Sequence, residues 1–156
     1  MANTTHAAKV PKFVRLGNMV TLALLRAGVR LVGPGMIVGE YPMYLLTVRG
    51  RKSGQPRTVA VAIMQQQGNR YIGSPYGIVD WVRNLRAAGE AVMTRGRRAE
   101  TVAARELSPA EAVPLLRQEI DRGNPFMRFY GVTRDSAQEE LERTAIEHPL
   151  FQLQAK

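Results

Sequence analysis

The chain has 156 residues and carries 22 Lys and Arg against 13 Asp and Glu, a formal net charge of +9. Its length fits one domain, and an apolar content of 45% is too high for a chain disordered throughout. The absence of cysteine excludes thiolate nucleophiles, thiolate metal sites and disulfides, and is compatible with the cytosol. With only two histidines, His6 and His148, the composition argues against a Ser-His-Asp triad and predicts no metal centre.

The positive charge is concentrated near the start of the chain. Residues 1–57 hold nine basic residues and one acid, a local charge of +8, whereas residues 58–156 are nearly balanced. Arginines supply 18 of the 22 cations, and their guanidinium groups grip phosphates and carboxylates through paired hydrogen bonds. An anionic partner is therefore expected in this region, and the candidates are a nucleic acid, a membrane surface and an anionic cofactor.

The first 34 residues are predicted to form a tail and an amphipathic helix. Apolar residues dominate from 9 to 31, but charges interrupt them too often for a membrane span, and no signal-cleavage site follows. Arg26 and Arg30 share one helical face, as in helices that lie on membranes or, more often, pack on their own domain. Gly33-Pro34-Gly35 ends the helix, so residues 35–156 are predicted to form the single globular domain.

Beyond this break, the pattern predicts an antiparallel sheet with helices. Short β-rich runs at 43–48, 57–64 and 70–73 predict three strands, and 91–94 with 99–105 predicts a hairpin. Three helices are predicted: at 80–88, at 108–122 with Ser108 as its N-cap, and at 136–147. The last one ends at His148-Pro149. Hairpins without strand–helix alternation favour an α+β, mainly β fold built on an antiparallel barrel over a doubly wound sheet.

The densest group of chemically useful residues lies between the first two predicted strands. The run Gly50-Arg51-Lys52-Ser53-Gly54-Gln55-Pro56-Arg57 places three cations, a hydroxyl and an amide in a turn with two glycines. Such a turn can bring backbone N–H groups and guanidinium groups to a bound anion, with Arg57 closing the nest. The alternative is a solvated hairpin turn whose charges protect the sheet edge, and the segment taken alone favours that alternative.

Two segments together resemble the deazaflavin-dependent nitroreductase family. The first runs from Tyr44 to Arg57, and the second, Asp80-Trp81-Val82-Arg83-Asn84-Leu85, is similar to the family's Trp-x-x-Asn-Leu segment. The resemblance implies a split antiparallel β-barrel that binds coenzyme F₄₂₀, an 8-hydroxy-5-deazaflavin with a phosphodiester and an oligoglutamate tail. The reduced cofactor would pass a hydride from C5 to an electron-poor acceptor such as a quinone, an enone or a nitroaromatic.

The resemblance also implies which residues hold the cofactor. The turn would hold the phosphate and the tail, the next strand and loop would lie along the deazaflavin ring, and the short helix would line the cleft. In that order, the residues are Arg51, Lys52, Ser53, Gln55 and Arg57, then Val59, Ala60, Ser74, Pro75, Tyr76 and Gly77, then Trp81 and Asn84. Tyr76, Tyr130 or solvent would donate the proton, although packing explains both tyrosines more simply.

Several alternatives stay open at this point. A barrel of this kind could carry a fatty acyl chain or another lipophilic ligand without turnover, and FMN could replace the deazaflavin. The multi-cation turn suits the longer anionic tail of F₄₂₀ better than FMN. Nucleic-acid binding is the weakest interpretation, because the cations are split between a helix and a turn and lack an aromatic stacking platform.

The expected partners follow from the resemblance. The acceptor is expected to be small and lipophilic, a class that includes unsaturated lipids, and an aromatic cluster at 126–130 could cap its pocket or pack against the barrel. A homodimer is expected because split barrels usually pair their sheets. The predicted location is the cytoplasm, with peripheral contact to the inner face of the cell membrane through the N-terminal helix.

Overall fold

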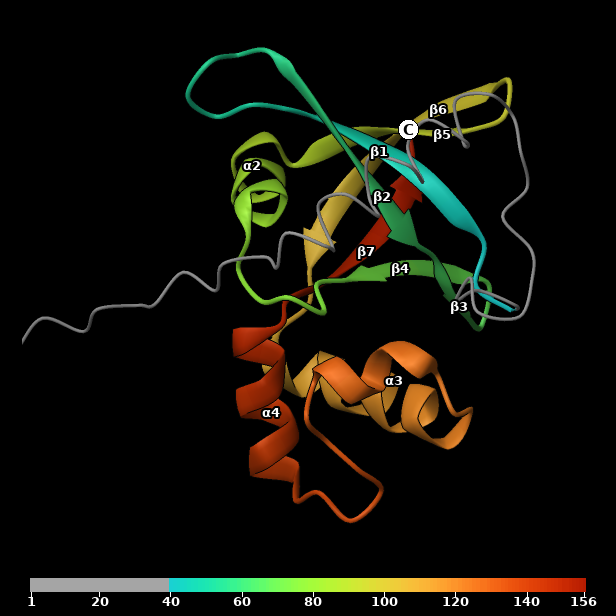
Figure 1. Cartoon of the computed structure of the whole chain (residues 1–156), viewed down its shortest axis with the longest axis vertical. Coiled ribbons are helices and arrows are strands. Elements are labelled where there is room, and N and C mark those ends of the chain that lie inside the picture. Colours follow the sequence, from blue (N-terminus) through green and yellow to red (C-terminus); the bar gives the residue numbers. More distant parts are fainter. Residues whose placement is uncertain (1–39) are drawn as a thin grey trace, which may run out of the picture.

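The computed structural model describes residues 40–156, so the predicted tail and the amphipathic helix at 9–31 lie outside the described residues. Figure 1 shows a curled sheet, with α2 beside it and α3 and α4 packed below it. The elements in chain order are β1 (Met43–Arg49), β2 (Pro56–Ala62), β3 (Met64–Gln66), β4 (Asn69–Gly73), α2 (Asp80–Ala88), β5 (Glu90–Arg95), β6 (Arg98–Glu106), α3 (Pro109–Asp121), the 3-10 helix η1 (Pro125–Phe129), α4 (Gln138–Glu147) and β7 (Leu150–Ala155).

The described strands form one sheet in the order β2-β1-β5-β6-β7-β4-β3, and every neighbouring pair is antiparallel. β2 and β3 lie at opposite edges of this order, yet only Ile63 separates them along the chain. Consecutive residues cannot lie far apart, so the sheet must curl until its edges meet. The Ile63 amide donates to the Pro42 carbonyl over 3.0 Å at this junction. The predicted split antiparallel barrel is confirmed.

Two differences from the predicted elements stand out. The apolar run at 57–64 is not one strand, because the chain bends at Ile63 and continues as β3. The predicted C-terminal helices are present as α3 and α4, but a strand that was not predicted, β7, follows α4 and pairs with both β6 and β4 in the sheet. Phe151 and Leu153 of β7 are buried in the barrel. The alternation of apolar and polar residues from Phe151 to Gln154 is a strand signal that the break at His148-Pro149 obscured.

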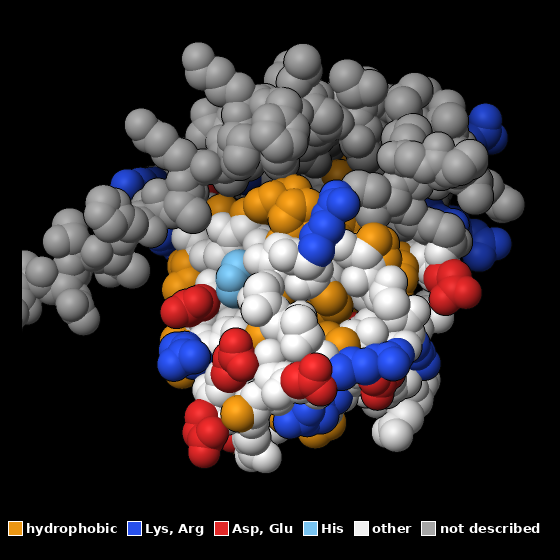
Figure 2. Space-filling view, turned by 60° about the horizontal axis from the view of Figure 1, so that its bottom comes forward, with side chains coloured by type: hydrophobic (Ala, Val, Ile, Leu, Met, Phe, Trp, Pro, Cys, Tyr) orange, Lys and Arg blue, Asp and Glu red, His pale blue; other side chains and the backbone are white. Residues whose placement is uncertain are grey.

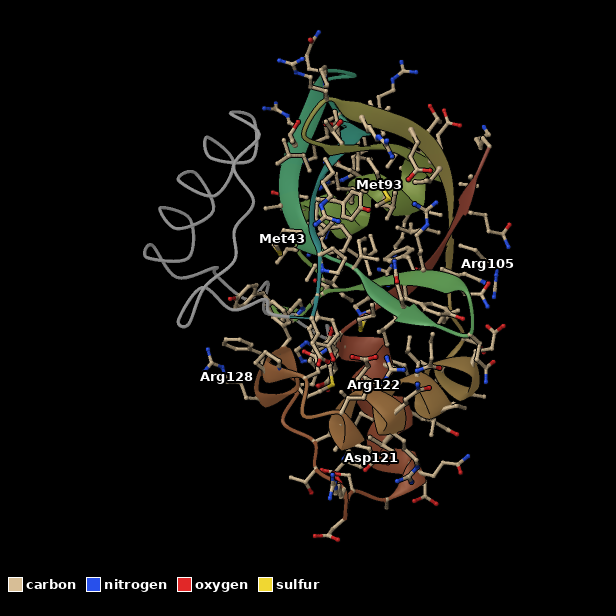
Figure 3. The ribbon with its side chains drawn as sticks, turned by 90° about the vertical axis from the view of Figure 1, so that its right-hand side faces the viewer. Met43, Met93, Arg105, Asp121, Arg122 and Arg128 are labelled. Atoms are coloured by element: carbon tan, nitrogen blue, oxygen red, sulfur yellow. The ribbon has the colours of Figure 1, made fainter. Side chains whose placement is uncertain are left out.

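The interior divides into two clusters of buried side chains. One fills the barrel beneath α2, and Figure 3 shows Met93 of this cluster inside the sheet. The other joins the sheet's lower edge to α3, η1 and α4. Burying one large aliphatic side chain stabilises a fold by about 1.5–3 kcal/mol. Because each cluster contains about a dozen buried residues, the barrel and the helical layer each have a core of their own.

Helix α3 begins with the predicted capping box. The Glu111 amide donates to Ser108 Oγ over 3.2 Å, and Glu111 Oε2 accepts the Ser108 amide at 2.8 Å. The same carboxylate accepts from Arg105 Nη1 at 3.0 Å. Hydrogen bonding to Arg105 first, and to Ser108 second, lowers the pKa of Glu111 to about 2.

A Glu111→Gln variant tests this pairing through its pH dependence. Because the folded-state pKa is depressed, the stabilisation is fully present above the ordinary value near 4.5 and is lost as pH falls toward 2. Glutamine keeps the capping acceptor but removes the charge. We expect the melting temperature of the wild type to exceed that of the variant at pH 7, and the gap to close by about pH 2. A gap that is constant with pH would contradict the assignment.

Candidate functional site

The loop between β1 and β2 is a tightly closed turn. The Gly50 amide donates to the Gln55 carbonyl and the Gly54 amide donates to the Gly50 carbonyl, each over 2.8 Å. A Cβ atom at Gly50 would lie 2.9 Å from Ser53 Oγ and 3.0 Å from the Gln55 carbonyl, so a larger residue would require the turn to shift. Gly54 has a φ of +68°, which other residues rarely adopt. The two glycines therefore let the backbone of residues 49–57, here called the basic turn, close tightly on itself.

A cleft of about 850 Å³ lies beside the basic turn. Figure 1 shows the turn arching over α2 at one end of the sheet. One wall of the cleft is the turn, and the other is formed by the end of α2 together with β5 and β6. The lining residues are Thr47, Val48, Arg49, Gly50, Arg51, Lys52, Ser53, Gly54, Pro56, Ala87, Ala88, Glu90, Ala91, Val92 and Thr101. The cleft thus combines cations and hydroxyl groups with small apolar side chains.

The cations of the basic turn are largely unneutralised. Within residues 40–156, Arg49, Lys52 and Arg57 form no ion pair or side-chain hydrogen bond, and all three are exposed. Glu90, the acid on the far wall, is instead paired with Lys156 Nζ at 2.5 Å. A cleft with free cations on one wall and a neutralised acid on the other attracts anions.

Arg51 differs from its neighbours because α2 holds it. Its amide and its Nη1 both donate to Asn84 Oδ1, over 3.2 and 2.9 Å, and its Nη2 donates to Asp80 Oδ1 over 3.2 Å. Asn84 is only 6% exposed and does not line the cleft. The predicted site residue Asn84 therefore joins the site through Arg51.

Val59 and Ala60, which were predicted to lie along the deazaflavin ring, are on opposite faces of β2. Val59 is opposite Leu46 of β1 and packs against the barrel core, whereas Ala60 is opposite Leu45 on the other face. Successive strand residues point to opposite faces, so a planar ring on one face meets only one of these side chains. Trp81 is half-buried over the barrel core, with its ring 6.2 Å from that of Phe151.

The loop at 74–77 forms a second group, which does not line the cleft. The Ser74 hydroxyl donates to the Gly77 carbonyl over 2.5 Å, and the Ser74 amide donates to the Pro149 carbonyl over 3.1 Å. His148 Nδ1 lies 3.0 Å from the Ser74 carbonyl. These bonds attach the loop to the end of α4. Pro75 and Tyr76 are half-buried in this loop.

The two tyrosines predicted as proton donors have different environments. Tyr76 is half-buried, with its ring 5.3 Å from Phe129 of η1. Tyr130 is 5% exposed in the helical core, with its ring 4.9 Å from His148. Burial first, and the charge of Glu119 second, raise the pKa of Tyr130 well above its ordinary value. The structure therefore leaves Tyr76 the more accessible of the two.

Tyr130 also explains a glycine in β4. A Cβ atom at Gly73 would lie 2.2 Å from the Tyr130 hydroxyl and 3.3 Å from Leu150. Because overpacking a core costs about 1–3 kcal/mol, we expect Gly73→Ala to lower the free energy of unfolding by about 2–3 kcal/mol in urea denaturation. Adding Tyr130→Phe removes the closest atom and should restore about 1 kcal/mol. A single variant within about 0.5 kcal/mol of the wild type would contradict this packing.

Some cleft residues were not predicted from the sequence. Arg49 was counted among the nearby cations but not assigned to the site, and Glu90, Val92 and Thr101 were not considered. Thr47 is directly opposite Val92, and Val92 is opposite Thr101, so the sheet order places them together. Hairpin patterns alone do not give the pairing of β1 with β5, because forty residues separate these two strands in the sequence.

The fold and the basic turn define a split-barrel protein with a cleft lined by cations. A sequence model of the F₄₂₀H₂-dependent quinone reductase family matches residues 26–136, and the chain therefore belongs to this family. Family membership confirms F₄₂₀ as the cofactor and oxidoreductase as the class of enzyme. The family description also names a quinone, one of the acceptors suggested by the sequence. No curated protein matches the chain.

Solved structures share the fold at low sequence identity. One, an F₄₂₀-H₂ dependent reductase (FDR-A), is 20% identical with a TM-score of 0.52, over 72% of this chain and 94% of that one. Another, described as a domain-swapped dimer, is 19% identical with a TM-score of 0.53, over 91% of this chain and 97% of that one. These likenesses support the split-barrel architecture.

The described residues fit a cofactor with an anionic tail. Phosphodiester and carboxylate oxygens require cationic donors, and Arg49, Arg51 and Lys52 supply them on one wall of the cleft. The glycines at 50 and 54 carry no side chain that would keep a ligand from the backbone of the turn. The donor set and the volume are thus suited to a tail rather than to a purely apolar ligand.

Proposed function

We propose that this F₄₂₀-dependent oxidoreductase binds the phosphate and the oligoglutamate tail of its cofactor at the basic turn and reduces a small lipophilic quinone. The observation that carries the proposal is the set of unneutralised cations beside the cleft. Arg49 and Lys52 line it without a carboxylate partner among the described residues.

The residues of the turn have separate tasks in this proposal. Arg49, Arg51 and Lys52 bind the anionic groups, and Arg57, beside Gly50, supports them from the start of β2. The Ser53 hydroxyl accepts the Gln55 amide at 3.3 Å and keeps the turn closed. When bound, the reduced deazaflavin supplies the hydride at C5.

The remaining predicted residues would bind and orient the ring. Trp81 and the loop of residues 74–77 are proposed to bound it, and one face of β2, with Val59 or Ala60, to support it. Tyr76, half-buried and beside Phe129, is the proposed proton donor, with solvent as the alternative source. Tyr130, which is buried in the helical core, would contribute to packing and not to proton transfer.

A lipophilic acceptor is proposed because aromatic side chains gather near the loop of residues 74–77. Phe129 contacts Tyr76, and the Arg128 guanidinium lies 4.7 Å from the centroid of the Phe129 ring. Figure 2, which brings the lower part of the molecule in Figure 1 forward, shows exposed hydrophobic side chains with a Lys or Arg side chain beside them. An apolar surface with a cation at its edge suits a quinone, whose ring is apolar and whose carbonyl oxygens accept hydrogen bonds. Enones and nitroaromatics also combine an apolar body with oxygen atoms that accept hydrogen bonds, and unsaturated lipids are the more apolar alternative.

Membrane contact and dimerisation belong to the same proposal. A quinone with a long apolar chain resides in a bilayer, and the basic helix predicted at 9–31 would bring the enzyme to an anionic surface. No helix among residues 40–156 is long and apolar enough to cross a bilayer. A homodimer in the cytoplasm or at the inner membrane face remains our expectation.

Titration of the protein with F₄₂₀, followed by its fluorescence, tests the cofactor site, and FMN serves as the comparison. We expect micromolar or tighter binding of F₄₂₀ and weaker binding of FMN. Reduced F₄₂₀ is then mixed with a quinone, an enone or a nitroaromatic, and the return of absorbance at 420 nm is followed. The quinone is expected to give the highest kcat/KM. Absence of F₄₂₀ binding would overturn the proposed site, and absence of quinone turnover would overturn the proposed acceptor.

A further inference from the structure

We infer that two residues of α2 act on Arg51 in opposite directions: Asn84 positions its guanidinium for an anion, and Asp80 competes with that anion. The inference rests on the proposed function, because the anion in question is the phosphate and tail of F₄₂₀. Neither residue lines the cleft, but both are hydrogen-bonded to the Arg51 guanidinium, and Arg51 does line it.

Asn84 is built to hold Arg51. It is 6% exposed, and a polar side chain at that depth is destabilising unless it is hydrogen-bonded. Its Oδ1 accepts hydrogen bonds from both the backbone amide and Nη1 of Arg51. The backbone and the guanidinium group of Arg51 are therefore held by the same atom. Because Asn84 is neutral, it orients the guanidinium without cancelling the charge. An ordered cation binds an anion better than a freely rotating one, since less side-chain entropy is lost.

Asp80 contacts the same guanidinium with the opposite consequence. Its Oδ1 lies 3.2 Å from Arg51 Nη2, and the Asp80 side chain is 83% exposed, whereas that of Arg51 is 28% exposed. A carboxylate on Nη2 occupies the donor that a phosphate oxygen would take. The same Oδ1 is 3.7 Å from Arg83 Nη1. Asp80 can therefore keep an ion pair with Arg83 when an anion displaces it from Arg51.

The two contacts predict how the site discriminates between ligands. A ligand that brings several negative charges gains from the other cations of the turn as well as from Arg51, and so displaces Asp80. A ligand without a phosphate has no anionic oxygen that could bind Arg51, so it leaves the ion pair between Arg51 and Asp80 intact. Removal of Asp80 should therefore strengthen tail binding, whereas removal of Asn84 should weaken it. A purely structural role for either residue does not predict opposite signs.

The test compares F₄₂₀ with its deazaflavin nucleoside, which lacks the phosphate and the tail, in fluorescence titrations of the full chain. For Asp80→Asn, we expect F₄₂₀ to bind about threefold more tightly at low salt, with the gain lost at about 0.5 M salt because Asp80 is exposed. For Asn84→Ala, we expect binding about tenfold weaker. Nucleoside affinity should change by less than about twofold in both variants.

Asp135→Asn is the matched control, because it removes one exposed acidic charge in the loop before α4, away from α2. Its F₄₂₀ affinity should stay within about 1.5-fold of the wild type. If Asn84→Ala does not fold, Asn84→Asp keeps the acceptor atom but cancels the charge of Arg51, and should also weaken F₄₂₀ binding about tenfold. Full F₄₂₀ affinity in a folded Asn84 variant would overturn the positioning role.

The inference and the proposed function fail in different ways. If the wild type does not bind F₄₂₀, the proposed site itself is wrong, and the inference falls with it. If the wild type binds F₄₂₀ but Asp80→Asn binds it equally or less tightly, the competing role of Asp80 is wrong and the proposed site stands. An equal gain for the nucleoside would also overturn the inference, because the effect would not act through the phosphate and the tail.

Discussion

Replacing Arg49 and Lys52 together with alanine is expected to weaken F₄₂₀ binding about 100-fold. Both side chains line the cleft and lack a carboxylate partner among the described residues, so their full charge is available to the ligand. A charge-assisted contact to a phosphate or carboxylate contributes about 1.4 kcal/mol or more, which is tenfold in affinity for each residue. Fluorescence titration of F₄₂₀ gives the dissociation constants.

The second basic turn of the chain supplies the matched control. Arg97 and Arg98 are exposed at the β5–β6 hairpin, which Figure 1 shows projecting away from the β1–β2 turn. Replacing both with alanine removes the same two charges, so it measures the effect of net charge alone. We expect less than about a threefold change in F₄₂₀ affinity. Equal losses in the two double variants would show that the basic turn is no specific site.

The variant that lacks Arg49 and Lys52 should keep the stability of the wild type. Neither Arg49 nor Lys52 makes a side-chain hydrogen bond in the described region, so their removal breaks no contact of the fold. The free energy of unfolding should change by less than about 0.5 kcal/mol. Loss of F₄₂₀ binding in a variant of unchanged stability separates a ligand contact from a structural role.

Local patterns in the sequence predicted most of the fold. Helix α2 has the predicted bounds because Asp80 opens its first turn and Gly89, with a φ of +68°, ends it. The capping box of α3 depends on the spacing of Ser108 and Glu111, which is visible in the sequence. Strand β7 was missed because the break at His148-Pro149 obscured its short alternation, and its position between β6 and β4 depends on pairing that no local pattern gives.

The site was predicted less completely than the fold. A glycine-closed hairpin with cations can be recognised locally, because its hydrogen bonds link neighbours such as Gly50 and Gln55. The hold of α2 on Arg51 joins residues about thirty positions apart, so no local pattern indicates it. Asn84 was assigned to the site through the family motif, but its contact with Arg51 emerged only from the fold. Arg49 shows that a cation at the end of a strand, next to such a turn, can line the same cleft.

The division of the core into two clusters helps to separate variants that change stability from variants that change ligand binding. The cleft lies on the barrel side, formed by β1, β5, β6 and the end of α2. The second cluster joins the sheet's lower edge to the helices and contains none of the lining residues. A change confined to that cluster should therefore alter stability without altering tail binding. Glu119 of α3 offers the sharpest test.

Glu119 is fully buried in the helical layer. Its Oε2 accepts from Asn124 Nδ2 at 2.7 Å, and its Oε1 lies 3.7 Å from Arg122 Nη1. Arg122 in turn donates to the Gln65 carbonyl of β3, and Figure 3 shows it where α3 meets the sheet. Burial first, and Glu119 second, raise the pKa of Tyr41 above its ordinary range. The carboxylate thus connects α3 with both the η1 segment and the sheet.

Replacing Glu119 with alanine is expected to lower the free energy of unfolding by about 3 kcal/mol in urea denaturation. The variant leaves a cavity, and it removes the hydrogen-bond acceptor of the buried Asn124 side-chain amide. The cavity and the unsatisfied donor each cost about 1–3 kcal/mol. Because whole domains are stable by only about 5–15 kcal/mol, the loss is large. Glu147→Ala, on the exposed end of α4, is the control and should cost less than about 0.5 kcal/mol.

F₄₂₀ affinity separates this effect from a role in the site. At a temperature where Glu119→Ala is folded, its dissociation constant for F₄₂₀ should lie within about twofold of the wild type, because the cleft is built on the barrel side. A stability loss below about 1 kcal/mol would show that the buried carboxylate contributes little to the fold. A tenfold loss of F₄₂₀ affinity in the folded variant would instead show that the helical layer and the cleft form one cooperative unit, since Glu119 touches no lining residue.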